Sequence, residues 1–81
     1  MNEEQILVNL TTVFRTVFAD DSLIATMEMT SSNVSAWDSL SHVDMIVMVE
    51  EIFNVRFSTR DIVNLKNVGD LVQVIQKCVP Q

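Results

Sequence analysis

Apolar residues in the first part of the chain recur at the spacing of one helix face. The residues at steps of three or four, and the two beside them, are Ile6, Leu10, Val13, Val17, Leu7 and Phe14. This pattern predicts an amphipathic helix from about residue 3 to residue 18. Glu3 and Glu4 fall in its first turn, where negative charge suits the helix dipole.

The helical pattern breaks between residues 19 and 38. This stretch is rich in Asp, Ser, Thr and Asn, whose side chains hydrogen-bond to nearby backbone and favour loops. A loop of this length in a small domain is often functional, and it has room for a short helical turn that the pattern does not place. The loop residues expected to reach the core are Leu23, Ile24, Met27 and Met29.

A second helix is predicted from Ser39 to about Phe53. The run from Met45 to Val49 favours a strand by composition, but about fifteen residues without a breaker are too long for a typical strand. Asp44, Glu50 and Glu51 fit one solvated side of such a helix. Because its valines and isoleucine are weak helix formers, tertiary packing must stabilise it.

The remaining chain predicts one short helix and one longer helix. After a connector at residues 54–57, Ser58 is a typical N-cap for a short helix to about Asn64, with Asp61 at its third position. Asn67 resembles the cap of the last helix, and Asp70 again follows three residues later. The core face of that helix is expected to be Val68, Leu71, Val72 and Ile75, with Lys77 in its last turn and Pro80 beyond it.

The fold class that follows is all-α: a bundle of three longer helices and one short helix, with a long loop between the first two. One Gly and one Pro leave few turn residues for a multi-stranded sheet. Eighty-one residues allow a single domain, 1–81, and a chain that begins at Met1 and ends at Gln81 is expected to be discrete.

Charge and composition exclude several classes of function. Five Lys and Arg against eleven Asp and Glu give a net charge of −6, which argues against nucleic acid and anionic membrane surfaces and favours partners with basic patches. One cysteine, Cys78, allows no internal disulfide and is expected to be a small hydrophobe or a free thiol. No apolar run is long enough for a membrane span, and the acidic N-terminus argues against a secretory signal. A cytoplasmic monomer is therefore expected.

Few residues could carry catalysis. The chain has one His and no Tyr. Ser39 and His42 could share a helix face, but a Ser–His hydrolase also needs an orienting carboxylate, an oxyanion hole and a pocket. Metal-ligand spacings and Gly-rich phosphate loops are missing from the sequence. We therefore expect no enzyme, no catalytic residue and no metal site.

The segment from Trp37 to Asp44, W-D-S-L-S-H-V-D, places a serine where the long loop meets a helix. The simplest interpretation is that Asp38 or Ser39 is an ordinary N-cap. If Ser39 is the cap, its replacement by alanine should cost about 1 kcal/mol.

Longer stretches on both sides of this serine resemble the acyl carrier protein family. Ser39 stands as the serine of the family's D-S-L motif, which carries phosphopantetheine. Similar stretches follow at the end of the family's second helix (Glu50 to Val55), at the start of its third (Phe57-Ser58, then Ile62) and at the opening of its fourth (Leu65 to Val72). The resemblance covers about residues 3–78 and is strongest from 37 to 72.

The resemblance implies a carrier rather than a catalyst. A phosphopantetheinyl transferase would attach 4'-phosphopantetheine from coenzyme A to Ser39, with Asp38 helping the transferase to bind. The arm would hold acyl groups as thioesters for fatty-acid, polyketide or related specialised biosynthesis. The physics agrees, because a phosphodiester at a helix N-terminus meets free N–H groups and the positive end of the dipole.

The resemblance also implies a docking face on the second helix. Leu40, Val43 and Val47 match an apolar strip that faces partners, although core packing is an equal explanation for Val43. The acids that match the family's face for basic patches of acyl-loading and acyl-processing enzymes are Asp44, Glu50 and Glu51. The alternative interpretation is that these three acids form a solvated face that keeps the protein soluble and binds no partner.

Several positions depart from bacterial fatty-acid carriers. Ser41 and Ile52 stand where those carriers usually have acids, and the W-D-S-L-x-H pattern looks more like carriers of specialised pathways. The simpler interpretation of Trp37 is an apolar anchor that closes the loop on the bundle. His42 could contact the phosphate, but solvent exposure is the simpler account of it. Met45 and Met48 could line a core that admits an acyl chain, with ordinary packing as the simpler account.

Two other functions remain open from the sequence. One is a peptidyl or aminoacyl carrier of the nonribosomal-peptide type. The other is an acidic helical adaptor that is never modified, in which Ser39 would be only a cap.

Overall fold

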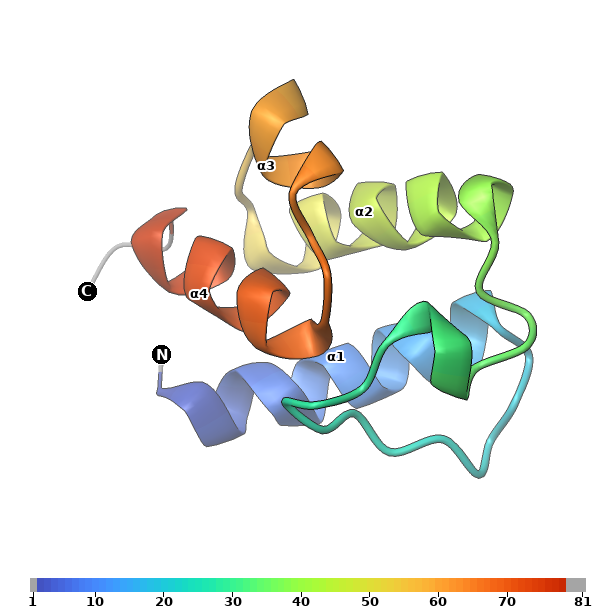
Figure 1. The fold of residues 1–81 in the computed structure, drawn as a ribbon. Helices are drawn as coiled ribbons and strands as arrows, with labels where there is room; N and C mark the ends of the chain where they lie inside the picture. The colour runs from blue at the N-terminus through green and yellow to red at the C-terminus, as the bar shows by residue number, and fades with distance from the viewer. Residues whose placement is uncertain (1, 79–81) are drawn as a thin grey trace.

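The computed structural model describes residues 2–78, which form four α-helices and one short 3-10 helix and contain no strand (Figure 1). The four α-helices are α1 (Glu3–Val17), α2 (Ser39–Phe53), α3 (Thr59–Val63) and α4 (Val68–Cys78), and the 3-10 helix η1 is Ser31–Asn33. The predicted all-α fold, with three longer helices, one short helix and a long first loop, is confirmed. Pro80, expected beyond the last helix, lies outside the described residues.

Side-chain caps set the starts of the helices. Asn2 Oδ1 accepts a hydrogen bond from the Gln5 N–H at 2.8 Å, and Gln5 Oε1 accepts one from the Asn2 N–H at 3.0 Å, so α1 begins with a capping box. Ser58 and Asp61 form the same arrangement before α3. At α4 the Asp70 N–H donates to Asn67 at 2.8 Å, as the sequence predicts.

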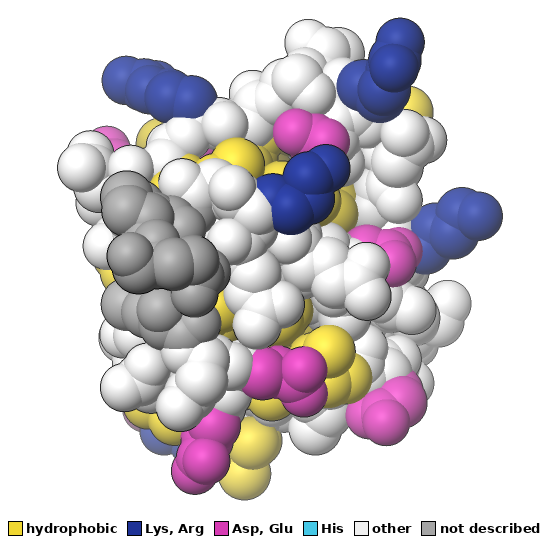
Figure 2. Space-filling view, turned by 90° about the vertical axis from the view of Figure 1, so that its left-hand side faces the viewer, with side chains coloured by type: hydrophobic (Ala, Val, Ile, Leu, Met, Phe, Trp, Pro, Cys, Tyr) yellow, Lys and Arg dark blue, Asp and Glu magenta, His cyan; other side chains and the backbone are white. Residues whose placement is uncertain are grey.

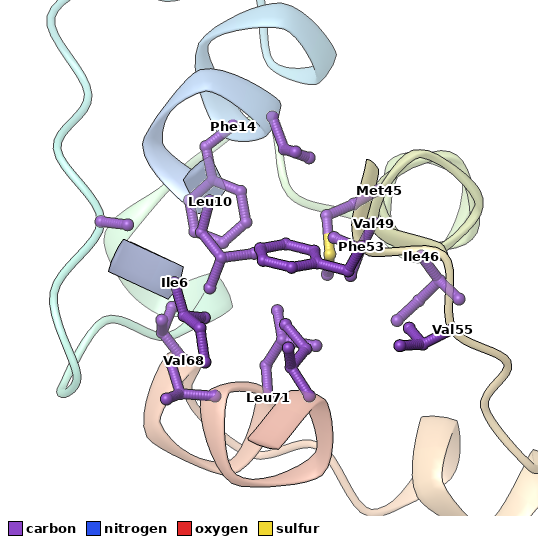
Figure 3. Close-up of a cluster of buried hydrophobic side chains, with 14 of the residues drawn as sticks. Ile6, Leu10, Phe14, Met45, Ile46, Val49, Phe53, Val55, Val68 and Leu71 are labelled. Carbon is purple, nitrogen blue, oxygen red and sulfur yellow. The ribbon is translucent and has the colours of Figure 1, made fainter. Parts of the chain in front are cut away.

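The core lies between α1, α2 and α4 (Figure 3). In the close-up, Ile6, Leu10 and Phe14 of α1 face side chains of α2, while Val68 and Leu71 of α4 close the cluster. The α2 residues buried in it are Met45, Ile46, Val49 and Phe53. Met45 is thus fully buried in the core, and tertiary packing supports the weak helix formers of α2.

The long loop, residues 18–38, is tied to two helices. The Arg15 Nε–H donates to the Leu23 carbonyl at 2.7 Å, and Thr11 Oγ1 accepts from the Ala25 N–H at 2.9 Å, which fixes the loop to α1. At α4 the Val68 and Gly69 N–H groups donate to the carbonyls of Met29 and Met27. The loop therefore has defined anchors on both sides of the bundle.

One expectation about burial is wrong. Ile24 was expected in the core, but its side chain is 63% exposed, and the loop buries Ala25 and Val34 instead. The anchor at Thr11 turns Ala25 inward, so its neighbour points to solvent. Val17, part of the apolar pattern of the first helix, is half-buried and packs against the core.

Candidate functional site

Ser39 is the first residue of α2, and its side chain is exposed at the end of the long loop. The cap is Asp38: its carboxylate Oδ1 accepts the Leu40 N–H at 3.0 Å and the Ser41 N–H at 2.9 Å. The Ser39 hydroxyl has no hydrogen-bond partner among residues 2–78. Ser39 is therefore not the cap, and the loss of about 1 kcal/mol expected for a capping Ser39 does not apply.

Ser41 completes the capping arrangement that holds the start of α2. Its hydroxyl accepts the Asp38 N–H at 2.8 Å and donates to the Ala36 carbonyl at 2.7 Å. The N–H and hydroxyl of Ser41 lower the pKa of the Asp38 carboxyl below its usual range. The position that often carries an acid in fatty-acid carriers thus serves local structure in this chain.

Trp37 anchors the loop, as the simpler interpretation expected. Its ring centroid lies 5.5 Å from those of Phe14 and Phe18. Its indole Nε1–H donates to Nδ1 of His42 at 3.1 Å, with 17° between the two ring planes. His42 is half-buried and bonded, so simple solvation is the wrong account of it.

A shallow hollow lies beside Ser39. It is lined by Ser31 of η1, Trp37, Asp38, Ser39 and His42. The long loop and the first turn of α2 therefore form its walls together. No sequence pattern singled out Ser31, because only the tertiary fold brings η1 to this junction.

The apolar strip of α2 points to solvent. Leu40, Val43 and Val47 are 78%, 56% and 49% exposed, so core packing is the wrong explanation for Val43. Ile52 and Val63 are also exposed and were not predicted as parts of an apolar surface. Ile52 stands at a position expected to be acidic from the family resemblance, which was a signal of its exposure; the spacing of Val63 gave none.

The three acids predicted for docking differ in their surroundings. Asp44 and Glu51 are exposed, and Glu51 lines two surface hollows that Val47 also lines. Glu50 is half-buried, and its Oε2 accepts the Phe57 N–H at 2.8 Å. Glu50 therefore supports the connection to α3, a role that its position in an acidic run did not reveal.

Nowhere in residues 2–78 do three or more His, Cys, Asp or Glu side chains gather as a group that could hold a metal ion. None of the helices that the structure describes is long and apolar enough to cross a membrane.

Comparisons with known proteins agree with this architecture. A family model for a phosphopantetheine attachment site matches residues 37–75. The acyl carrier protein of Acidothermus cellulolyticus is 33% identical over 75 residues, which cover 93% of this chain and 89% of that protein. That of Coprothermobacter proteolyticus is 30% identical over 76 residues, covering 94% of this chain and 93% of that protein. The solution structure of a holo acyl carrier protein from Geobacter metallireducens aligns with a TM-score of 0.83 and 43% identity, over 89% of this chain and 83% of that one.

The chain belongs to the acyl carrier protein family. It is a carrier and not an enzyme, and its prosthetic group is covalently attached phosphopantetheine. Its partners are the enzymes that modify it and process its acyl group.

Proposed function

We propose that Ser39 is the attachment residue, and that the chain, as a single domain, carries acyl intermediates as thioesters for fatty-acid, polyketide or related specialised biosynthesis. The observation that carries this proposal is the free, exposed hydroxyl of Ser39, beside a cap that Asp38 forms together with Ser41. A transferase can reach such a hydroxyl without breaking the first turn of α2.

The surroundings of Ser39 fit the group. The hollow beside it leaves room for the first atoms of an arm, and no core residue needs to move. The arm ends in a thiol, which holds the acyl group as a thioester. This chain's own contribution is to present the arm and bring its cargo to partner active sites at high effective concentration.

We infer that partners dock on the exposed strip of Leu40, Val43 and Val47 and on Asp44 and Glu51 beside it. Glu50 contributes less, because its carboxylate is engaged by the Phe57 N–H. With Ser41 in the capping box and Ile52 in place of an acid, this face is less acidic than that of typical bacterial fatty-acid carriers. We therefore favour partners of a specialised pathway, in the cytoplasm.

The test is an intact mass spectrum after incubation with coenzyme A, Mg²⁺ and a promiscuous phosphopantetheinyl transferase. The wild type should gain the mass of one phosphopantetheine, and Ser39→Ala should gain none. Ser35→Ala, an exposed loop serine, is the matched control and should gain the same mass as wild type.

Ser39→Ala should also keep the fold. Because Asp38 is the cap, its free energy of unfolding should stay within about 0.5 kcal/mol of wild type. A folded wild type that gains no mass with a cognate transferase either would favour the unmodified adaptor. Aminoacyl loading of the holo form would favour the peptidyl-carrier alternative.

A further inference from the structure

The first turn of α2 offers few free donors to an anion. The Leu40 and Ser41 N–H groups donate to the Asp38 carboxylate, and the His42 N–H donates to the Asp38 carbonyl at 2.9 Å. A phosphodiester at Ser39 therefore does not meet the row of free N–H groups expected from the sequence. In this turn only the Ser39 N–H is left without a partner among residues 2–78, so a nearby side-chain donor would add to what that N–H and water supply.

The His42 ring provides a donor at this place. An indole N–H can only donate, so Nδ1 of His42 accepts from Trp37 and must lack a proton. In the neutral imidazole the proton then sits on Nε2, and Nε2 has no partner among residues 2–78. The small angle between the planes, 17°, suits an in-plane N–H pointing at an in-plane lone pair.

His42 and Ser39 share one side of α2. They are three residues apart, so their side chains are neighbours on the helix, and both line the same hollow. Asp38 lines it too, but its carboxylate is an acceptor, and Oδ1 already accepts the Leu40 and Ser41 N–H groups. The residues that line the hollow include no Lys or Arg. The Trp37 indole N–H already donates to His42, so the imidazole Nε2–H is the ring N–H of this lining that is free to bind an anion.

We propose that Nε2–H of His42 donates a hydrogen bond to the phosphodiester of the arm, and that Trp37 is the positioning residue that fixes this tautomer. The proposal rests on attachment at Ser39. Ser39 directly precedes Leu40, and His42 directly precedes Val43. Consecutive residues of a helix are about 100° apart around its axis, so Ser39 and His42 lie to one side of the apolar strip. The bond would therefore hold the root of the arm on the loop side of α2, clear of a partner docked on Leu40 and Val43.

The first step of the test is NMR spectroscopy of the ¹⁵N-labelled apo protein in mildly alkaline buffer. His42 is the one His and Trp37 the one Trp of the chain, so both ring signals assign themselves. Long-range ¹H–¹⁵N correlations should show the proton on Nε2. Trp37→Phe, which keeps an aromatic ring but removes the indole N–H, should reduce that preference.

The second step follows the same signals through attachment of the arm, verified by mass. The Nε2 proton should shift, and its exchange with water should slow severalfold. The ³¹P signal of the holo form should move in His42→Phe and return toward wild type in His42→Gln, whose amide can also accept and donate. Ser35→Ala is the matched control and should leave the ³¹P signal in place.

The outcomes separate the two proposals. An arm that attaches while the Nε2 and ³¹P signals stay unchanged overturns the role of His42 alone. A wild type that gains no mass overturns attachment at Ser39 and the role of His42 with it. The decisive Nε2 measurement uses the wild type, so it does not depend on whether a variant folds.

Discussion

Asp38 and Ser39 are neighbours with separate duties at the start of α2. Asp38 binds two backbone N–H groups, while the Ser39 hydroxyl is left without a partner in the described chain. Aspartate and serine are about equally good caps, so composition could not assign the two roles. The backbone conformation determines which residue is the cap, because Asp38 is extended and directly precedes the first helical residue.

The low pKa of Asp38 makes stability depend on pH. Hydrogen bonds from the Ser41 N–H and hydroxyl lower the pKa in the folded state, so the folded chain binds this proton less readily than the unfolded chain. The stabilisation of the fold by ionised Asp38 is therefore complete above the ordinary Asp pKa of about 4. It is lost as the pH falls through and below that value. We expect urea midpoints to fall between about pH 5 and pH 3, and to fall less in Asp38→Asn.

Ser35→Ala serves as the control for this titration, since it changes an exposed loop residue without touching a carboxylate. Asp20 adds a similar contribution, because the Ser22 hydroxyl and N–H lower its pKa. An Asp38→Asn protein with the full acid sensitivity of wild type would contradict the assignment to Asp38.

Ala19 has a backbone conformation that suits glycine better. Its φ is 53°, in the left-handed region where a Cβ is disfavoured, and its side chain is exposed. Ala19→Gly should therefore raise the free energy of unfolding, by about 0.5–1 kcal/mol after the entropy of the unfolded chain is counted. Ala36→Gly, at an exposed residue of the same loop with negative φ, should not stabilise the protein in the same urea titration.

At the scale of elements, the connection between α2 and α3 depends on one carboxylate. Asn54 ends α2 in the left-handed conformation, with φ 55°, and the chain turns so that Phe57 donates its N–H to Glu50. Glu50→Ala leaves this half-buried N–H without its partner and should cost about 1–2 kcal/mol in urea unfolding. Glu50→Gln keeps an acceptor oxygen and should recover part of the loss.

Glu51→Ala is the matched control for that experiment. It removes the neighbouring charge from the same helix, but its side chain is exposed. Its free energy of unfolding should stay within about 0.5 kcal/mol of wild type. Equal losses in the two alanine variants would show that Glu50 acts only as a surface charge.

The helices could be predicted from the sequence because their signals are local. Periodicity predicted α1, the length of a run without a breaker predicted α2, and the caps at Ser58 and Asn67 predicted the starts of α3 and α4. The loop could not be predicted residue by residue, since contacts with Thr11 decide that Ala25 rather than Ile24 is buried. The Trp37–His42 bond was missed for the same reason, because it depends on where Phe14 and Phe18 hold the indole.

Over the whole molecule, the two signs of charge are unevenly distributed. Apart from Arg15, the basic residues come from the last third of the chain: Arg56, Arg60, Lys66 and Lys77. On the face shown in Figure 2, Lys and Arg side chains stand out in the upper half, with acids between and below them. Asp38, Asp44 and Glu51 mark α2 as acidic, so a partner with a basic patch should be steered to that helix.

Steering of this kind should be sensitive to salt. Raising the ionic strength from about 0.05 M to 0.5 M should lower kcat/KM of the transferase severalfold, since screening shortens the range of the field. The double variant Asp44→Asn/Glu51→Gln should raise KM and lose much of this salt dependence, with kcat little changed. Glu3→Gln/Glu4→Gln removes the same charge from the start of α1 and is the matched control; equal effects of the two doubles would contradict docking on α2.

The backbone bonds from Val68 and Gly69 to residues 27–29 have a consequence for the newborn chain. The loop that leads to Ser39 is made early in synthesis, but half of its anchorage belongs to the last helix. During synthesis this loop therefore cannot complete its contacts with the bundle until Val68 and Gly69, some forty positions later, have been made. A transferase that acts on the finished loop therefore requires a chain in which α4 has already been made.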